Sequence, residues 1–245
     1  MLTAYFDDSG NDDVAVVAGY LGTVQMWKEF DKRWRNLLLK TGVEQMHRSA
    51  LESFKGEFVG WTPDQRTEFA KKSHAIIKRC TYAPIGIAII KKDFDAAFPS
   101  GHTARRFGLY SWCIHSCLAA LGKWCKAHNK REPVDFIFEA GTDGRDQVDK
   151  TFALLYKHPE TRPLDACRIG TWSFAGKNIQ PLQAADVVAY ELFKLVHNVA
   201  VEQRKRNIRY SAIDLFKNTD ISLLSWFDSK AFEGLRGEKI PGWDY

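Results

Sequence analysis

Carboxylates stand at three points of this chain where an apolar element would ordinarily exclude them. Asp7 and Asp8 close an apolar run that begins at Leu2, Glu139 ends a second apolar run, and Asp186 lies within a third. A carboxylate in apolar surroundings is costly unless it is paired or coordinates a metal. Because Mg²⁺ and Mn²⁺ prefer carboxylate oxygens, the three points predict a site for one or two such ions, which could support phosphoryl transfer.

Each acid also has an ordinary alternative explanation. Asp7 and Asp8 precede Ser9-Gly10 and fit a plain turn, while Glu139 fits a solvated strand end. Asp186 is the most informative acid, because capping and the helix dipole act mainly within the first turn and it lies beyond that turn if the helix begins at Pro181. Pairing with a distant base remains an alternative to metal binding.

Other polar residues are candidates for catalysis or substrate binding. His47 stands in an irregular stretch, where a histidine can transfer protons near neutral pH, or be a surface residue. Lys177, just before the Asp186 segment, is a candidate phosphate contact. The densest basic cluster, which could equally be a solvated helix end, consists of Arg204, Lys205 and Arg206, with Arg209 close by.

A zinc site is excluded by spacing. Cys113, Cys117, Cys125 and His128 fall on one expected helix, where Cys113 and Cys125 would lie about 18 Å apart. One ion cannot bridge that distance, so the cysteines are expected to be buried thiols without metal.

The elements that must position these residues follow from hydrophobic periodicity and turn signals. Strands are expected at Leu2–Phe6, Val14–Leu21, Tyr82–Ile90, Val134–Glu139 and Ala166–Phe174. Helices are expected at Val24–Lys40, Pro63–Cys80 with Thr62 as N-cap, Thr103–His128, Asp146–Tyr156 and Pro181–Val201. Met46–Trp61 is expected to be an irregular connection, Phe94–His102 a loop, and the tail beyond Ile208 a set of short helices. This order predicts one α/β domain over residues 1–245, with a mixed sheet that opens on a β-hairpin and is flanked by helices.

Bulk composition sets further limits. The chain has 245 residues, 45% of them hydrophobic, and a net charge of +5. Its pI of about 8.9 permits a polyanionic partner without requiring one. No apolar run approaches the roughly 18 residues of a membrane span, no signal peptide is evident, and the five cysteines suggest no disulfide framework. We therefore expect a reduced cytoplasmic protein without a membrane partner.

Two sequence motifs carry a resemblance to a known family. The run from Tyr5 to Asn11 and the run from Leu182 to Ala189 resemble the opening and closing motifs of the bacterial domain-of-unknown-function family 3800. That family usually has glutamate where this chain has Asp8. The positions of His47 and Glu139 are also similar to the family pattern.

The resemblance implies a ribonuclease H-like fold, in which Asp7, Glu139 and Asp186 would hold Mg²⁺ or Mn²⁺ and Asp8 would be an additional ligand. It implies a nuclease that hydrolyses phosphodiester bonds of DNA or RNA, with a role in defence or mobile elements. His47 would assist proton transfer, and Lys177 and the basic cluster would contact phosphates. Alternatives are a metal-dependent hydrolase of a small phosphorylated substrate, and a non-catalytic binding module. The sequence does not distinguish DNA from RNA, or a monomer from a homo-oligomer.

Overall fold

The chain folds around one mixed β-sheet, seen in a computed structural model that describes residues 1–102, 105, 108–142, 144–158, 169–203 and 208–234. The strands are β1 (Leu2–Gly10), β2 (Val14–Thr23), β3 (Ala83–Ile90), β4 (Val134–Glu139), β5 (Ile169–Ala175) and β6 (Leu224–Phe227). The helices are α1 (Val24–Thr41), α2 (Arg48–Ser53), α3 (Pro63–Cys80), α4 (Lys91–Ala97), α5 (Gly108–Ala127), α6 (Arg145–Lys157), α7 (Gln180–Val196), α8 (Tyr210–Phe216) and α9 (Ser229–Gly234). A 3₁₀ turn spans Gly56–Phe58, and a π-helical turn at His197–Val201 extends α7.

The strand order is β5-β4-β1-β2-β3-β6, and only β2 runs antiparallel to its neighbours. The predicted opening hairpin is confirmed, and its strands are longer than expected. Asn11 closes the turn, because its side-chain oxygen accepts hydrogen bonds from the N–H groups of Asp13 and Val14. The sheet thus sets β1 between β2 and β4, at the centre of the molecule.

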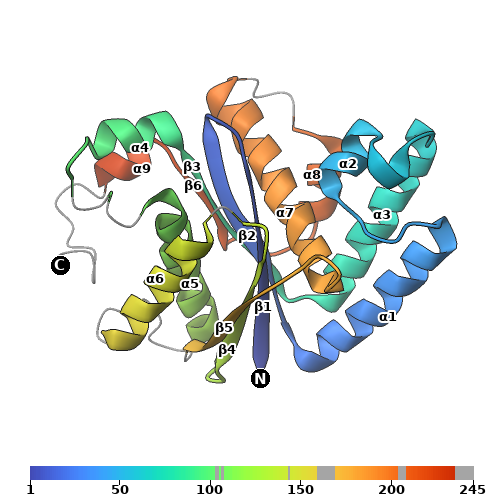
Figure 1. The fold of residues 1–245 in the computed structure, drawn as a ribbon, viewed down its shortest axis with the longest axis horizontal. Coiled ribbons are helices and arrows are strands. Elements are labelled where there is room, and N and C mark those ends of the chain that lie inside the picture. The colour runs from blue at the N-terminus through green and yellow to red at the C-terminus, as the bar shows by residue number, and fades with distance from the viewer. Residues whose placement is uncertain (103–104, 106–107, 143, 159–168, 204–207, 235–245) are drawn as a thin grey trace.

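Strand alternation divides the core into two layers. Leu2, Ala4 and Phe6 face the layer that contains α5, while Tyr5 packs with the opposite layer, which contains α1, α3 and α7. Figure 1 shows α4, α5, α6 and α9 on one face of the sheet and α1, α2, α3, α7 and α8 on the other. Successive residues of β1 therefore serve different faces, which separates Asp7 from Asp8.

Helix α7 packs directly on the three central strands β1, β2 and β3. Gly86 of β3 makes this close approach possible, because a Cβ atom there would lie 2.9 Å from Cδ2 of Leu192 and 2.7 Å from the Cβ of Ala18. The sheet face of α7 is accordingly almost fully buried, and Asp186 is carried into that layer.

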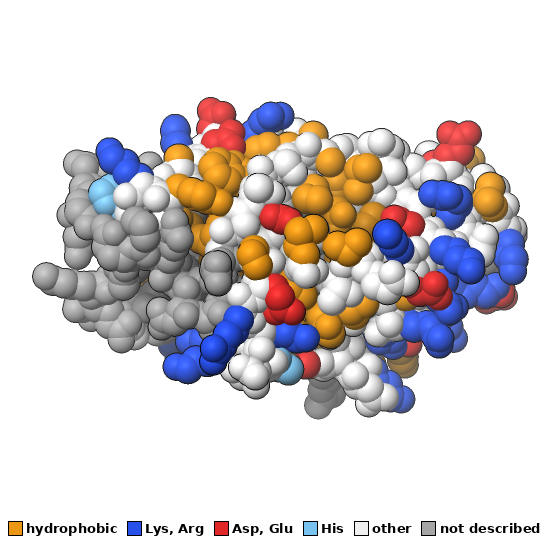
Figure 2. Space-filling model, turned by 90° about the horizontal axis from the view of Figure 1, so that it is seen from below, with side chains coloured by type: hydrophobic (Ala, Val, Ile, Leu, Met, Phe, Trp, Pro, Cys, Tyr) orange, Lys and Arg blue, Asp and Glu red, His pale blue; other side chains and the backbone are white. Residues whose placement is uncertain are grey.

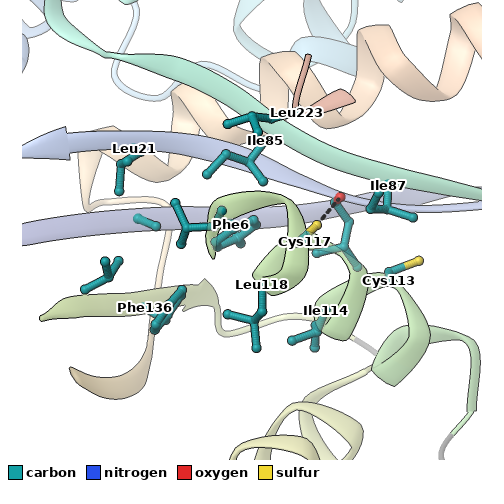
Figure 3. Packing of buried hydrophobic residues seen from close by; sticks show 14 of the residues in the cluster. Phe6, Leu21, Ile85, Ile87, Cys113, Ile114, Cys117, Leu118, Phe136 and Leu223 are labelled. Carbon is teal, nitrogen blue, oxygen red and sulfur yellow. Dashed lines mark hydrogen bonds between the residues drawn. The ribbon is translucent and has the colours of Figure 1, made fainter. Parts of the chain in front are cut away.

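The cysteines of α5 are buried, as their helical spacing predicts. Cys113 and Cys117 pack among Ile87, Ile114 and Leu118, and Cys117 Sγ lies 3.7 Å from the carbonyl oxygen of Val17 (Figure 3). Burial raises the pKa of the Cys113 thiol to about 12, so the thiol stays protonated.

The expected boundaries of several elements are confirmed. Thr62 caps α3 by accepting from the N–H of Gln65, and the Gln65 side chain accepts from the N–H of Thr62 in return. Helix α1 begins at Val24 as expected and ends one residue later than expected, and its buried residues are Trp27, Phe30, Trp34, Leu37 and Leu38.

The sequence-based expectations were wrong at three short elements. Helix α4 begins before the expected loop Phe94–His102 and covers its first four residues. Helix α2 lies within the expected irregular connection, and β6 adds a strand to the expected helical tail. Each has seven residues or fewer, which is too short to show a period, and burial against the core stabilises it instead. No helix of the described residues is long and apolar enough to cross a bilayer.

Candidate active site at the Asp7 and Asp186 carboxylates

Two acids from opposite ends of the sequence meet around one ammonium group. Lys177, in the connection between β5 and α7, places its Nζ atom 3.0 Å from Oδ2 of Asp7 and 3.6 Å from Oδ2 of Asp186. All three side chains are largely buried, with 15% of the Lys177 side chain exposed and less of the two acids. The fold therefore brings two of the three predicted metal ligands to a single cationic position.

Burial away from water shifts the pKa values of Asp7 and Lys177. Burial raises the pKa of Asp7 to about 7, Lys177 opposes that rise, and the charge of Asp186 adds to it. For Lys177, burial alone would lower the pKa of the ammonium, but Asp186, Asp7 and Glu139 outweigh it and the pKa is raised. The ammonium consequently stays charged, while Asp7 exchanges a proton near neutral pH.

His47 lies beside Asp186, and its role in proton transfer stays a prediction. Its Nδ1 atom is 3.8 Å from Oδ2 of Asp186, and about half of its side chain is exposed. The next residue, Arg48, begins α2 and donates its backbone N–H to the same Oδ2 at 2.9 Å. The segment that carries His47 is thus fixed to α7 through the acid itself.

Gln183 fixes the surroundings of Asp186 from one helical turn earlier on α7. Its side-chain oxygen accepts from Trp34 Nε1 at 2.8 Å and from the N–H of Met46 at 3.0 Å. Its amide nitrogen donates to the carbonyl oxygen of Lys177 at 2.9 Å. One buried amide therefore sets the backbone next to both His47 and Lys177. Its place in the closing motif was visible in the sequence, but its partners were not.

A buried ion pair, missed by sequence reasoning, fixes α2 to α7. Nε of Arg48 donates to Oε1 of Glu191 at 2.8 Å, and both side chains are almost fully buried. A second guanidinium nitrogen lies 3.0 Å from Oε2 of Glu52, and the group also lies over the Tyr190 ring. An acid within an apolar helix indicates a buried partner, so Glu191 was a detectable signal. The sequence did not indicate which of the many lysines and arginines would pair with it.

Glu139 lies at the same end of the sheet as Asp7, at the carboxyl end of β4. The pairing of β1 with β4 ends at Phe6 and Phe138, so Asp7 and Glu139 follow at the next position of two parallel strands. The carboxylate of Glu139 accepts from the N–H of Gly141 at 2.6 Å. Its charge contributes to the raised pKa of Lys177. Its joining Asp7 and Asp186 on one ion stays a prediction.

Asp8 lies on the opposite face of β1 from Asp7. There it faces Tyr110 of α5, whose hydroxyl also contacts that of Thr142. Burial raises the pKa of Tyr110, and Asp8 raises it further. Whether Asp8 also serves as a metal ligand is a prediction.

The structure places one of the predicted phosphate contacts at the site and does not describe the others. Lys177 is at the site but is already paired with acids. Arg204, Lys205 and Arg206 lie outside the described residues. Seen from below, lysine and arginine side chains gather at the end of the molecule formed by α1 and α3 (Figure 2).

The donor set at this position fits a hard divalent cation in part. Asp7 Oδ2 is buried without a well-directed hydrogen bond, and it faces the same ammonium as an oxygen of Asp186. Carboxylate oxygens are the ligands that Mg²⁺ and Mn²⁺ prefer. Over the described ranges, no three His, Cys, Asp or Glu side chains are grouped as a metal site. A cation bound by Asp7 and Asp186 would have to displace Lys177.

No protein-family model matches the sequence, and no curated protein matches it.

Proposed function

We propose that this protein is a divalent-metal-dependent nuclease with a ribonuclease H-like core. The observation that carries the proposal is the meeting of Asp7 and Asp186, 179 positions apart in the sequence, at one buried cationic position. Acids from the first strand and from a late core helix, with Glu139 on the strand beside β1, follow the order that the family resemblance implies.

The residues of the site have distinct roles in this proposal. Asp7 and Asp186, joined by Glu139, would hold Mg²⁺ or Mn²⁺, which supplies charge neutralisation and an activated water to phosphodiester hydrolysis. His47, beside Asp186 and half-exposed, would transfer a proton to or from the reacting oxygens. Lys177, once displaced from the acids, would contact a phosphate of the substrate.

The decisive experiment is a nuclease panel of DNA and RNA substrates with Mg²⁺ and Mn²⁺, run beside the Asp186→Asn variant. The variant should lose metal-dependent cleavage while remaining folded, because it keeps the shape of the side chain but loses the charge. Thermal melts should show that Mg²⁺ stabilises the parent and not the variant. If the variant unfolds and metal does not stabilise the parent, Asp186 is instead a structural acid paired with Lys177.

Salt dependence separates the nuclease from a hydrolase of small phosphorylated substrates. Each phosphate that a protein neutralises releases counterions, so nucleic-acid affinity should fall steeply as salt rises from 50 to 200 mM, by about 10³–10⁵ for 6–10 contacts. A small substrate with one phosphate would show a much weaker dependence.

A further inference from the structure

A cavity lies next to the acid site, on the far side of Arg48. It has a volume of about 510 Å³ and opens between α2, α3 and the start of α8. This volume falls within the range of about 300–1,000 Å³ that is usual for small-ligand pockets. The predicted metal site does not include it, and Arg209, close to the predicted basic cluster, lines it.

The walls of the cavity carry more positive than negative charge. The charged lining residues, apart from His74, are Arg48, Arg66, Lys71, Arg209, Glu52 and Asp214. Three of the guanidinium groups share Glu52: Arg48 at 3.0 Å, Arg66 at 3.8 Å, and Arg209 at 2.5 Å. Burial alone would raise the pKa of Glu52, but Arg48 and Arg209 lower it. Glu191, behind the cavity wall, also pairs with Arg48 and Arg209. Two carboxylates thus face three guanidinium groups, which leaves one positive charge unbalanced.

Several of these cations have hydrogen-bond capacity left for a ligand. Lys71 is exposed and has no ion-pair partner among the described residues, and Arg66 is bound to Glu52 only at long range and through a backbone carbonyl. Guanidinium groups match the geometry of phosphate oxygens better than that of most other anions. The Tyr210 ring at the rim is 90% exposed, and such a ring can stack on a base.

Arg48 connects this cavity to the acid site. Arg48 lines the cavity, and its backbone N–H donates to Asp186. A phosphate in the cavity would therefore lie near a strand whose scissile bond is at Asp7 and Asp186.

We propose that the cavity binds the phosphate of a nucleotide, with Arg66, Lys71 and Arg209 as its donors and Tyr210 beside the base. The phosphate belongs either to a nucleotide flanking the scissile bond of a nucleic acid or to a free nucleotide. The choice of a nucleotide rests on the proposed function, whereas the binding of a phosphate rests on the cavity alone.

The test is calorimetric titration at low salt, in EDTA, with adenosine monophosphate, adenosine, inorganic phosphate and a series of single-stranded oligonucleotides. The Arg66→Ala/Lys71→Ala variant removes two cations that are not needed for the buried pair. The matched control is Lys72→Ala, because Lys72 adjoins Lys71 in sequence but pairs with Glu68 outside the cavity. Circular dichroism confirms that each variant is folded.

Adenosine monophosphate should bind and adenosine should bind far more weakly. The double variant should weaken binding by about tenfold or more, since lost hydrogen bonds to a charged group have roughly that effect, and the control should change it little. Affinity that rises with oligonucleotide length and falls in the double variant would assign the phosphate to a nucleic-acid strand. Tighter binding of the mononucleotide would assign it to a free nucleotide.

Failure of this proposal is distinct from failure of the nuclease proposal. The adenosine monophosphate titration is repeated on Asp186→Asn, which should bind this probe normally, because none of the proposed phosphate donors belongs to the acid site. Binding with no nuclease activity in any metal would overturn the nuclease and keep the cavity. Absence of binding by every phosphate-bearing probe, binding that the double variant leaves unchanged, or equal binding of adenosine would overturn the cavity proposal.

Discussion

At the acid site, Asp7 bears two energetic costs that the sequence alone would not reveal, which are burial of its charge and repulsion by a second acid. Asp7 is buried at 4% exposure and faces both a cation and a second acid. Lys177 reduces the cost of that burial by supplying an opposing charge at 3.0 Å. Lys177 is therefore more than a phosphate contact, since it also neutralises the acids when no metal is bound.

The raised pKa of Asp7 should make the free energy of unfolding depend on pH. Unfolded, Asp7 has its ordinary pKa of 3.8, whereas folding raises it to about 7. Between these values the folded protein binds the extra proton, so the free energy of unfolding falls as pH rises from about 4 to 7. Asp7→Asn cannot ionise, so its unfolding free energy should exceed that of the parent at pH 8, by about 1–3 kcal/mol.

Urea denaturation at pH 5 and pH 8 in EDTA measures this directly. The difference between variant and parent should grow with pH. A variant that is less stable than the parent at pH 8 would mean that Lys177 holds Asp7 ionised, contrary to the raised pKa.

His47 should matter to rate more than to stability. His47→Ala should reduce metal-dependent cleavage by about 10²–10⁴-fold, the usual contribution of general acid–base catalysis. Its half-exposed side chain predicts little change in melting temperature or in metal affinity. His128→Ala, at the end of α5, is the control. An unchanged rate across pH 6 to 9 would show that His47 is an ordinary surface histidine.

At the scale of elements, α7 organises the site. Gln183, Asp186 and Glu191 lie along it and bind, respectively, the Met46 backbone, the Arg48 backbone and the Arg48 side chain. Helix α2 has only six residues and could not persist alone, so these contacts determine its position. The position of His47 is a consequence of the same contacts.

Glu191→Gln tests this arrangement. It leaves the Arg48 guanidinium buried without its main partner, which should cost about 3–5 kcal/mol of unfolding free energy. The N–H of Arg48 should exchange with solvent faster, because the segment that presents it to Asp186 loosens. Glu52→Gln, which removes a partly exposed partner of the same arginine, should cost about 1 kcal/mol or less. Equal costs for the two variants would contradict the role assigned to Glu191.

For the molecule as a whole, stability rests on the two apolar layers and not on the site. Leu121 of α5 is fully buried, and Leu121→Ala should lower the free energy of unfolding by about 2–5 kcal/mol through lost contacts and a cavity. Leu39→Ala is the matched control, since Leu39 is 73% exposed and should cost less than about 0.5 kcal/mol. Nearly equal effects in urea denaturation would contradict the layer assignment.

The sequence by itself determined the elements with a long period and the order of the acids. Hydrophobic spacing located α1, α3, α5 and α7, and turn chemistry located the opening hairpin. These features are local, so neighbouring residues contain the information. Glycine, proline and capping residues marked the boundaries for the same reason, as Thr62 and Pro63 do at α3.

Only the tertiary structure decided which charges meet. Lys177 could have paired with many acids, and Arg48 carried no signal that its partner was Glu191, 143 positions away. Short α2, α4 and β6 were also missed, because burial and long-range pairing stabilise them rather than local propensity. Ion pairing depends on distances that arise only when the sheet and α7 are packed, and those distances are the physical basis of the candidate site.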